Sequence, residues 1–156
     1  MARVAIALGS NLGDRRAHLD FAASRLASVF SNLIVSRYHE TDPVGVPGEQ
    51  PLFLNAAALA ETAAAPRAVL DRLMAIEREC GRERPFPNAA RTLDLDLILL
   101  GDVVIDEPGL TIPHPRFRDR RFVLEPLAEI APELVDPVTG STVAELLAAL
   151  ETFRSA

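Results

Sequence analysis

The segment from Leu93 to Leu100 constrains the fold more than any other part of the chain, because leucines and aspartates alternate along it. Side chains two residues apart on a strand point to the same face of a sheet. The four odd-numbered leucines, Leu93 to Leu99, are therefore expected to face a core. Asp94 and Asp96 then share the opposite face, about 6.6–7 Å apart along the strand. The segment predicts a strand with one packed face and one face that carries two carboxylates.

Apolar patterning along the rest of the chain predicts alternating strands and helices. The expected strands are Val4–Leu8, Leu33–Tyr38, Phe53–Leu59, Thr92–Leu100 and, after a turn at Gly101-Asp102, Val103–Ile105. The expected helices are a first one ending at Phe30, then Pro66–Cys80, Phe122–Ala131 and Val143–Leu150, and the expected loops are Thr41–Pro51, Arg82–Ala90 and Thr111–Pro115. This order predicts a ferredoxin-like α+β sandwich of βαββαβ type with a C-terminal helical extension. A length of 156 residues fits one domain, 1–156.

Charge and composition exclude several classes of protein. The 16 basic and 22 acidic residues give a net charge of −6, which argues against nucleic acid or an acidic membrane as partner. All basic residues are arginines, so a Schiff-base lysine and a Walker A lysine are excluded, although a codon preference also explains the absence of lysine. The single cysteine, Cys80, excludes an internal disulfide and suits a reducing compartment. No apolar run approaches the roughly 18–20 residues of a membrane span, so we expect a soluble, cytoplasmic protein.

Asp94 and Asp96 form a candidate metal site. Two carboxylates on one face of an apolar strand repel each other and are costly to bury without a partner. A divalent cation between them removes both costs. Because neither Cys nor His is adjacent in the sequence, the ligands are hard oxygens, which favour Mg²⁺. An exposed strand face on which the aspartates pair with arginines fits the same pattern, and the spacing leaves both interpretations open.

Eight of the sixteen arginines lie between positions 78 and 121, around this strand. Carboxylates ringed by arginine are typical of a polyphosphate site, since the guanidinium group binds phosphate oxygens with several donors. The candidates for phosphate binding are Arg82, Arg84, Arg91 and Arg120. Solvated charges are the interpretation that we give to Arg78, Arg116 and Arg118. His114, held between two prolines, is either a phosphate donor or a side chain that stabilises a turn.

The segment Thr41–Gly45, followed by Phe53 and Asn55, is interpreted as the wall of a binding site. Such a loop offers backbone donors and acceptors to a planar ligand, an aromatic ring offers a stacking face, and an amide offers one donor and one acceptor group. A phenylalanine on a strand is also compatible with a core position, and Phe122 is ambiguous in the same way. Gly9–Gly13 lacks both the Rossmann spacing and a lysine, so it is interpreted as a structural turn.

Together these segments resemble the 6-hydroxymethyl-7,8-dihydropterin pyrophosphokinase family of the folate pathway. The resemblance spans the chain from Gly9-Ser10-Asn11-Leu12-Gly13 to Leu124-Glu125-Pro126-Leu127. Its strongest parts are Arg91-Thr92-Leu93-Asp94-Leu95-Asp96, Pro113-His114-Pro115-Arg116 and Arg120-Arg121-Phe122. Supporting matches are Asn55 after Phe53, and Glu77 followed by Gly81-Arg82 and Arg84.

The resemblance implies transfer of the pyrophosphoryl group of ATP to the hydroxymethyl oxygen of the pterin, giving AMP and the pterin diphosphate. It implies two Mg²⁺ held by Asp94 and Asp96, and a triphosphate bound by Arg82, Arg84, Arg91, His114 and Arg120. Arg82 and Arg91, with the two aspartates, are the residues expected to act in catalysis. Thr41 and Val44 would meet the pterin through backbone atoms, Asn55 would hydrogen-bond its ring, and Phe53 and Phe122 would enclose it. The expected partners are these two small molecules, without nucleic acid or membrane, and the expected state is a monomer.

The chain departs from the family pattern at three places. The Pro85–Ala90 loop is short and lacks a tryptophan that some members place over the pterin, Asp42 stands where some have proline, and Phe53 replaces a tyrosine. Two other functions stay open from the residues: a non-catalytic ferredoxin-like ligand-binding module, and a metal-dependent phosphodiesterase or nuclease. The module would not need the aspartates and arginines together, and the phosphodiesterase would use water and act without the pterin.

Overall fold

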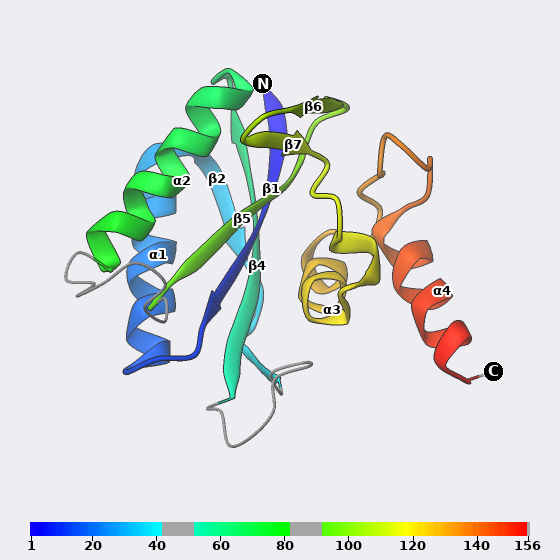
Figure 1. Cartoon of the computed structure of the whole chain (residues 1–156), viewed down its shortest axis with the longest axis horizontal. Coiled ribbons are helices and arrows are strands. Elements are labelled where there is room, and N and C mark those ends of the chain that lie inside the picture. Colours follow the sequence, from blue (N-terminus) through cyan, green and yellow to red (C-terminus); the bar gives the residue numbers. More distant parts are fainter. Residues whose placement is uncertain (42–51, 82–91, 156) are drawn as a thin grey trace.

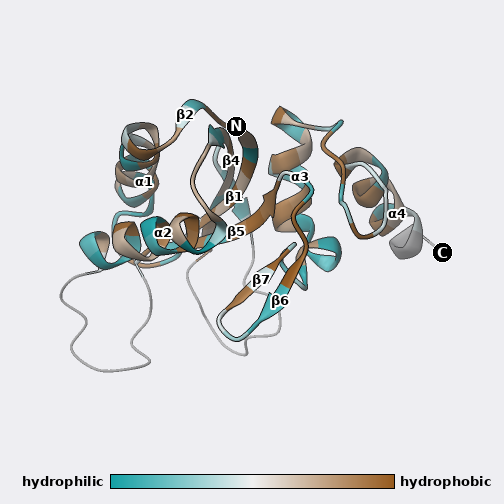
Figure 2. Ribbon diagram, turned by 90° about the horizontal axis from the view of Figure 1, so that it is seen from above, coloured by the Kyte–Doolittle hydropathy of each residue, from teal (hydrophilic) through white to brown (hydrophobic). Residues whose placement is uncertain are grey.

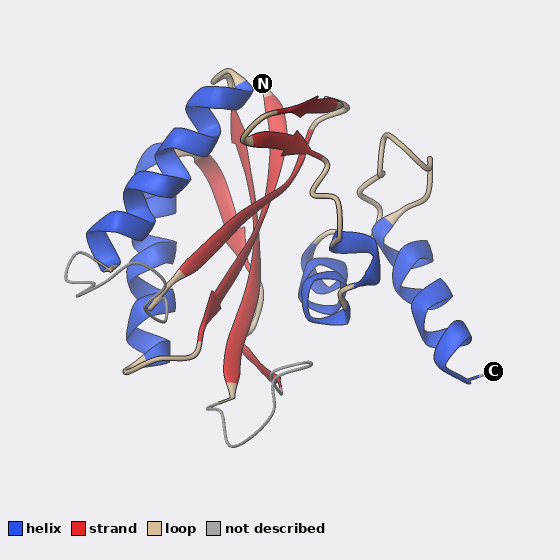
Figure 3. Cartoon of the chain, viewed as in Figure 1, coloured by secondary structure: helices blue, strands red, loops and turns tan. Residues whose placement is uncertain are grey.

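The structure, a computed structural model, describes residues 1–41, 52–81 and 92–155. Its strands and helices are interleaved along the chain (Figure 3). In order they are β1 (Ala2–Ser10), α1 (Arg15–Val29), β2 (Ser31–Val35), β3 (His39–Thr41), β4 (Phe53–Thr62), α2 (Pro66–Cys80), β5 (Asp94–Leu100), β6 (Ile105–Glu107), β7 (Leu110–Ile112), a 3₁₀ turn (Phe117–Asp119), α3 (Arg121–Ile130) and α4 (Val143–Ser155).

One antiparallel sheet forms the centre of the protein. Its strand order is β2-β4-β1-β5, and β3 pairs with β4 as well. The helices α1 and α2 cover one face of this sheet, α3 covers the other, and α4 lies on the outer side of α3 (Figures 1 and 2). In the described part of the chain, no helix combines the length and the apolar character that a membrane crossing requires.

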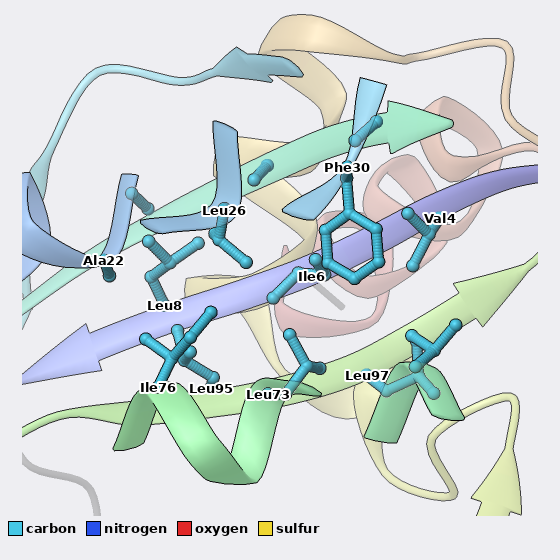
Figure 4. Close-up of a cluster of buried hydrophobic side chains, with 14 of the residues drawn as sticks. Val4, Ile6, Leu8, Ala22, Leu26, Phe30, Leu73, Ile76, Leu95 and Leu97 are labelled. Carbon is cyan, nitrogen blue, oxygen red and sulfur yellow. The ribbon is translucent and has the colours of Figure 1, made fainter. Parts of the chain in front are cut away.

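The larger part of the core lies between the sheet and the helices α1 and α2 (Figure 4). Alternate residues of β1 point into it, namely Val4, Ile6 and Leu8. They meet side chains that recur at helical spacing: Leu19, Ala22 and Leu26 on α1, and Val69, Leu73 and Ile76 on α2. Burying a large aliphatic side chain contributes about 1.5–3 kcal/mol, so this layer of side chains fixes both helices against the sheet. The helical faces that the sequence predicts are confirmed.

The second cluster of buried side chains lies between the opposite face of the sheet and α3. The strands contribute the small residues Ala5 and Ala57 together with the larger Leu59, Ile98 and Leu99, and the helix contributes Val123, Leu124 and Leu127. The predicted site residues Asp94 and Asp96 lie on this face of the sheet.

The expectation that Leu99 shares a face with the preceding odd-numbered leucines is wrong. The register between β1 and β5 shifts between Ala5, which pairs with Leu99, and Ile6, which pairs with Leu97. Ile98 is thus an extra residue on β5, and such a bulge reverses the alternation of side chains. Leu99 accordingly packs in the cluster under α3, whereas Leu97 packs under α1 and α2.

The bounds of the expected strand Leu33–Tyr38 are also wrong. The strand β2 ends at Val35, the next three residues are not in a strand, and β3 begins only at His39. The N–H of Ser36 donates to the carbonyl of Ala57 at 2.9 Å, but the Ala57 N–H donates to the hydroxyl oxygen of Ser36, also at 2.9 Å. A side-chain oxygen thus takes the place of a backbone carbonyl in the ladder. Because the hydroxyl group accepts this hydrogen bond in place of a carbonyl, the regular pairing with β4 is interrupted before β3 begins at His39.

The expected strand Val103–Ile105 needs a third correction, because only Ile105 belongs to a strand, β6. The chain turns at Gly101-Asp102, but Val103–Ile105 does not fold back onto β5. Instead β6 pairs with β7 in a separate two-stranded sheet, with Ile105 opposite Ile112. Part of the expected loop Thr111–Pro115 is therefore a strand. The apolar residues of this strand, Leu110 and Ile112, are buried in the main core. The nearby prolines alone do not indicate this burial.

Candidate active site

Asp94 and Asp96 lie at the start of β5, on the face of the sheet that α3 covers. The intervening Leu95, with Leu93 and Leu97, is buried on the opposite face against α1 and α2. Both aspartates are partly exposed. The structure therefore confirms the predicted separation of leucines and carboxylates onto two faces of one strand.

The pairing of three strands brings Asn55 onto the same face as the aspartates. Asn55, Gly9 and Asp94 form one row across β4, β1 and β5, and Ala57, Ala7 and Asp96 form the next row. The central positions of both rows have little or no side chain. Asn55 on β4 and the two aspartates on β5 therefore lie on either side of β1, with only its small residues between them.

Gly9 has a specific role in this arrangement that the sequence analysis missed. A Cβ atom built on Gly9 would lie 3.2 Å from Oδ1 of Asn55, which is tighter than an ordinary contact. Gly9 also belongs to β1, so the part of Gly9–Gly13 that was interpreted as a turn begins as strand. The absence of a side chain at Gly9 lets Asn55 lean over the strand toward the aspartates.

Thr41 fixes the orientation of Asn55. The Nδ2 group of Asn55 donates a hydrogen bond to Oγ1 of Thr41, and Asn55 is 5% exposed. Thr41 itself pairs with Phe53 across β3 and β4. Phe53 is partly exposed and belongs to neither buried cluster, so a core role for its ring is not what the structure shows. Thr41 at the end of β3 thus lies beside Phe53 and Asn55 at the start of β4.

His114 approaches β5 from the loop that follows β7. Its backbone N–H donates to the carbonyl of Ile98 at 2.9 Å. Its ring Nδ1 accepts the backbone N–H of Arg116 at 3.1 Å, which assigns the ring proton of neutral His114 to Nε2. Burial lowers the pKa of His114, whereas the charge of Asp96 acts to raise it. The charges of Arg120 and Arg116 lower it further, so the pKa lies below the ordinary value of 6.5. His114 thus offers a neutral Nε2–H donor close to Asp96 and Arg120.

Arg120 and Phe122 stand at the start of α3. The carbonyl of Arg120 accepts the N–H groups of Val123 and Leu124, both at 3.0 Å, and its guanidinium carbon lies 5.6 Å from the centre of the Phe122 ring. Phe122 packs partly buried against the cluster under α3. The cationic group and the aromatic ring are thereby held together on the helix that covers the candidate site.

One predicted surface charge has a different role. Arg118, interpreted from the sequence as solvated, donates from Nη2 to Oδ1 of the buried Asp136 at 3.0 Å, and from Nε to Oδ2. Its pairing partner lies 18 residues away, which a local pattern does not reveal. Arg78 and Arg116 are exposed, as expected.

The Asp94–Asp96 pair fits a magnesium site that has few protein ligands. Within residues 1–41, 52–81 and 92–155, no group of three or more His, Cys, Asp or Glu side chains is placed to hold a metal. Mg²⁺ usually keeps several waters and binds through one or two carboxylates together with substrate phosphates, so the Asp94–Asp96 pair suits it. Arg82, Arg84, Arg91 and Val44, also predicted for the site, lie outside the described residues.

The antiparallel sheet with helices on both of its faces defines a protein of the α+β class, and the polar residues beside α3 are its candidate active site. Residues 5–132 match the model of the family described as 7,8-dihydro-6-hydroxymethylpterin-pyrophosphokinase (HPPK). The chain belongs to this family and is a transferase of the pyrophosphokinase type. The resemblance seen in the sequence is confirmed.

Named relatives cover nearly the whole chain. A 2-amino-4-hydroxy-6-hydroxymethyldihydropteridine pyrophosphokinase of Pseudomonas aeruginosa is 43% identical over 149 residues, which is 94% of this chain and 91% of that protein. The protein of the same name from Methylorubrum extorquens is 39% identical over 153 residues, covering 97% of this chain and 95% of the relative. A folic acid synthesis protein, fol1, of Pneumocystis carinii is 39% identical over 142 residues, and these make up only 19% of its length.

Solved structures of larger proteins share the fold. The wild-type HPPK-DHPS of Plasmodium falciparum superimposes with a TM-score of 0.77 at 14% identity, covering 95% of this chain and 44% of that chain. A structure of HPPK-DHPS in complex with substrates gives a TM-score of 0.78 at 12% identity, covering 99% of this chain and 44% of that one. This chain therefore corresponds to less than half of each of these proteins.

Proposed function

We propose that this chain transfers the pyrophosphoryl group of ATP to the hydroxymethyl oxygen of 6-hydroxymethyl-7,8-dihydropterin in folate biosynthesis. The products are AMP and the pterin diphosphate. The observation that carries the proposal is the row of Asn55, Gly9 and Asp94 across three strands. It places the residue predicted for the pterin and a residue predicted for metal and phosphate on one face of the sheet. Membership of the family, over residues 5–132, supports the same activity.

The nucleotide end of the site is formed by β5 and the segment that leads into α3. Asp94 and Asp96 are proposed to hold two Mg²⁺, which would neutralise charge on the phosphate oxygens. His114 donates from its neutral Nε2–H to a phosphate oxygen, and Arg120 adds a permanent positive charge at the start of α3, where the helix dipole also favours an anion. Arg82, Arg84 and Arg91 complete the proposed triphosphate contacts.

The pterin end is formed by the ends of β3 and β4 together with α3. Asn55 presents Oδ1 to the ligand because its amide nitrogen is held by Thr41. Phe53 on β4 and Phe122 on α3 are proposed to stack on the two faces of the pterin ring. Thr41 and Val44 are proposed to contact its edge through backbone atoms. The tyrosine found in other members is not needed for stacking, since the phenylalanine ring keeps the same face.

The chain's own contribution to the reaction is positioning and charge stabilisation, which dominate in phosphoryl-type transfer. The pterin oxygen forms a bond to the β-phosphorus while the bond from that phosphorus to the bridging oxygen of AMP breaks. The hydroxyl proton leaves with this step, and we assign no side chain as its base. The residues on β4 hold the alcohol, those on β5 and before α3 hold the triphosphate, and Arg82 and Arg91 are proposed to act beside the two aspartates.

We also propose a ferredoxin-like topology in a single catalytic domain, 1–156, that acts as a monomer in the cytoplasm. Taken with β3 as the continuation of β2, the element order is βαββαβ, and the strand order β2-β4-β1-β5 supports this class. The lone thiol of Cys80 suits a reducing compartment. Sedimentation of the purified chain at several concentrations tests the monomer, and a dimer at all of them would refute it.

The test of the activity is product identification. The enzyme is mixed with ATP, Mg²⁺ and 6-hydroxymethyl-7,8-dihydropterin, and the nucleotides and pterins are separated by ion exchange. We expect one AMP and one pterin diphosphate per turnover, both dependent on Mg²⁺ and on the pterin. Stoichiometric ADP would refute pyrophosphoryl transfer. AMP formed without the pterin would indicate the phosphodiesterase, and binding without turnover would indicate the non-catalytic module.

A further inference from the structure

The short strand β3 carries one wall of the proposed pterin site but has little structure of its own to hold it there. It has three residues and pairs only with β4 among the described strands. A pairing of this length is marginal without other contacts. Side chains that contact β3 and its neighbours must therefore help to hold Thr41 in place.

Arg15 joins the ends of β3 and β4. It is the first residue of α1, and its Nη2 donates to Oε1 of Glu40 on β3 at 2.9 Å. Its Nη1 donates to the carbonyl of Leu52, immediately before β4, at 2.7 Å. The Arg15 side chain is only 27% exposed. One planar guanidinium group thus holds two chain segments that are 12 positions apart in the sequence.

These two acceptors lie next to the residues of the proposed pterin site. Glu40 directly precedes Thr41, and Leu52 directly precedes Phe53, while Thr41 and Phe53 are paired across the two strands. The planar guanidinium group of Arg15 binds both segments through donors of fixed geometry, so it sets the distance between them. A lysine offers one flexible ammonium group and does not fix this distance.

Other contacts support α1 as the fixed frame for β3. The hydroxyl of Tyr38 donates to Oδ1 of Asp20 on α1 at 2.6 Å, and Arg16 lies over the Tyr38 ring at 5.2 Å. On the other face, Nε2 of His39 is 3.0 Å from Oε1 of Glu129 on α3. The chain is held from both sides as it enters the site.

We propose that Arg15 is a positioning residue for the pterin end of the site. It fastens the ends of β3 and β4 to α1 and thereby holds Thr41 and Phe53 at the separation that the pterin requires. The inference rests on the proposed function for its substrate, whereas its structural part does not depend on any ligand.

The variant that tests this inference is Arg15→Met, and its matched control is Arg25→Met. Arg25 lies on the same helix and forms an ion pair with Glu79 at 2.8 Å, but its partner is on α2, away from β3 and β4. We expect Arg15→Met to raise the KM for the pterin about tenfold, equivalent to about 1.4 kcal/mol. The KM for ATP and kcat should stay within about twofold, and Arg25→Met should leave all three within the same range. Arg15→Lys should raise the pterin KM by a smaller factor.

A second measurement needs no ligand. Hydrogen exchange of the Glu40, Thr41 and Phe53 amides should accelerate in Arg15→Met and not in Arg25→Met. Wild-type exchange in Arg15→Met would overturn the inference, as would a pterin KM that stays at the wild-type value in both Arg15 variants. An equal rise of the two KM values would also overturn it, because positioning of one substrate predicts a selective effect. If the wild-type enzyme shows no pterin-dependent turnover, the proposed function fails, and the exchange experiment alone decides the role of Arg15.

Discussion

The carboxylate of Glu77 accepts the backbone N–H of Leu95 at 2.8 Å. Leu95 is the residue between Asp94 and Asp96, so α2 is bonded to the strand backbone at the centre of the carboxylate pair. The hydrogen bond has an ionised acceptor, which makes it stronger than a neutral one. Glu77 thus contacts the backbone between the two aspartates of the proposed nucleotide end, from the α2 side of the sheet.

Replacement of Glu77 by alanine should impair both stability and magnesium use. The Leu95 N–H would lose its acceptor, at a cost of about 1–3 kcal/mol in the free energy of unfolding. The Mg²⁺ concentration for half-maximal activity should rise about 10–100-fold, as expected when a group behind metal ligands is removed. Urea unfolding and a Mg²⁺ titration of turnover measure the two effects.

Glu79→Ala is the matched control for this prediction. Glu79 lies on the same helix, and its ion pair with Arg25 is exposed, with each side chain 38% accessible. Exposed pairs contribute about 0–1 kcal/mol, so this variant should lose little stability and keep the wild-type Mg²⁺ dependence. A wild-type Mg²⁺ requirement in Glu77→Ala would contradict the positioning of the aspartates by α2.

Replacement of Asp96 by asparagine should abolish transfer without unfolding the protein. We expect kcat to fall by a factor of about 10²–10³ or more, comparable with the loss of a major electrostatic contact in a transition state. Removing one of two neighbouring carboxylates relieves repulsion, so the melting temperature without Mg²⁺ should be equal or higher. Asp102→Asn, in the exposed turn after β5, should keep full activity. Near-normal turnover of Asp96→Asn at saturating Mg²⁺ would refute the metal assignment.

Tyr38 provides an optical test of the contacts that hold β3. Burial and the hydrogen bond to Asp20 raise the pKa of Tyr38 to about 12. It is the only tyrosine and the chain has no tryptophan, so the absorbance of phenolate reports this group alone. The raised pKa means that its contribution to stability is complete below pH 10 and is lost as the pH rises toward 12.

In the native protein the midpoint should lie near 12, and Asp20→Asn should lower it while leaving it above 10, since burial remains. Circular dichroism at each pH checks that the chain is folded. A native midpoint at 10 would show that the phenol is neither buried nor bonded as described.

The buried ion pair of Asp136 and Arg118 should govern stability in acid. Burial acts to raise the pKa of Asp136, but hydrogen bonds from Arg118, Thr139 and the N–H of Val138 outweigh it and hold the pKa below 3.8. This contribution is therefore complete above about pH 4 and is lost as the pH falls through the lower, folded-state pKa.

Asp136→Asn should lower the free energy of unfolding at pH 7 by about 2–3 kcal/mol, less than the 3–5 kcal/mol of a fully buried pair, because Arg118 is 25% exposed. Urea unfolding of both proteins at pH 7 and pH 3 should show the difference narrowing in acid. A difference that is constant over this range would mean that the charge of Asp136 does not contribute.

The sequence predicts the parts of the fold and site that depend on local period. The alternation of leucine and aspartate identifies the two faces of β5, and helical spacing identifies the buried faces of α1 and α2. The family resemblance supplies the roles that spacing leaves open, such as that of His114.

The parts that the sequence does not predict depend on contacts between distant segments. The bulge at Ile98 depends on the register with β1, and the break after β2 depends on the Ser36 hydroxyl that accepts the N–H of Ala57. The space beside Gly9 is limited by the side chain of Asn55, which belongs to another strand. None of these has a periodic signal, because each exists only when two strands are already paired.

The break between β2 and β3, which begins at Ser36, also affects how the protein behaves at high concentration. Long, straight sheet edges are templates for strand addition and aggregation. Here the described edge beside β4 is split into strands of five and three residues, and Asn32 within the first has a positive φ of 54°. At the opposite edge, Glu77 and the N–H of His114 already bind β5 at Leu95 and Ile98. Along the described residues, the sheet therefore offers another chain only short or interrupted edges, which disfavours aggregation by strand addition.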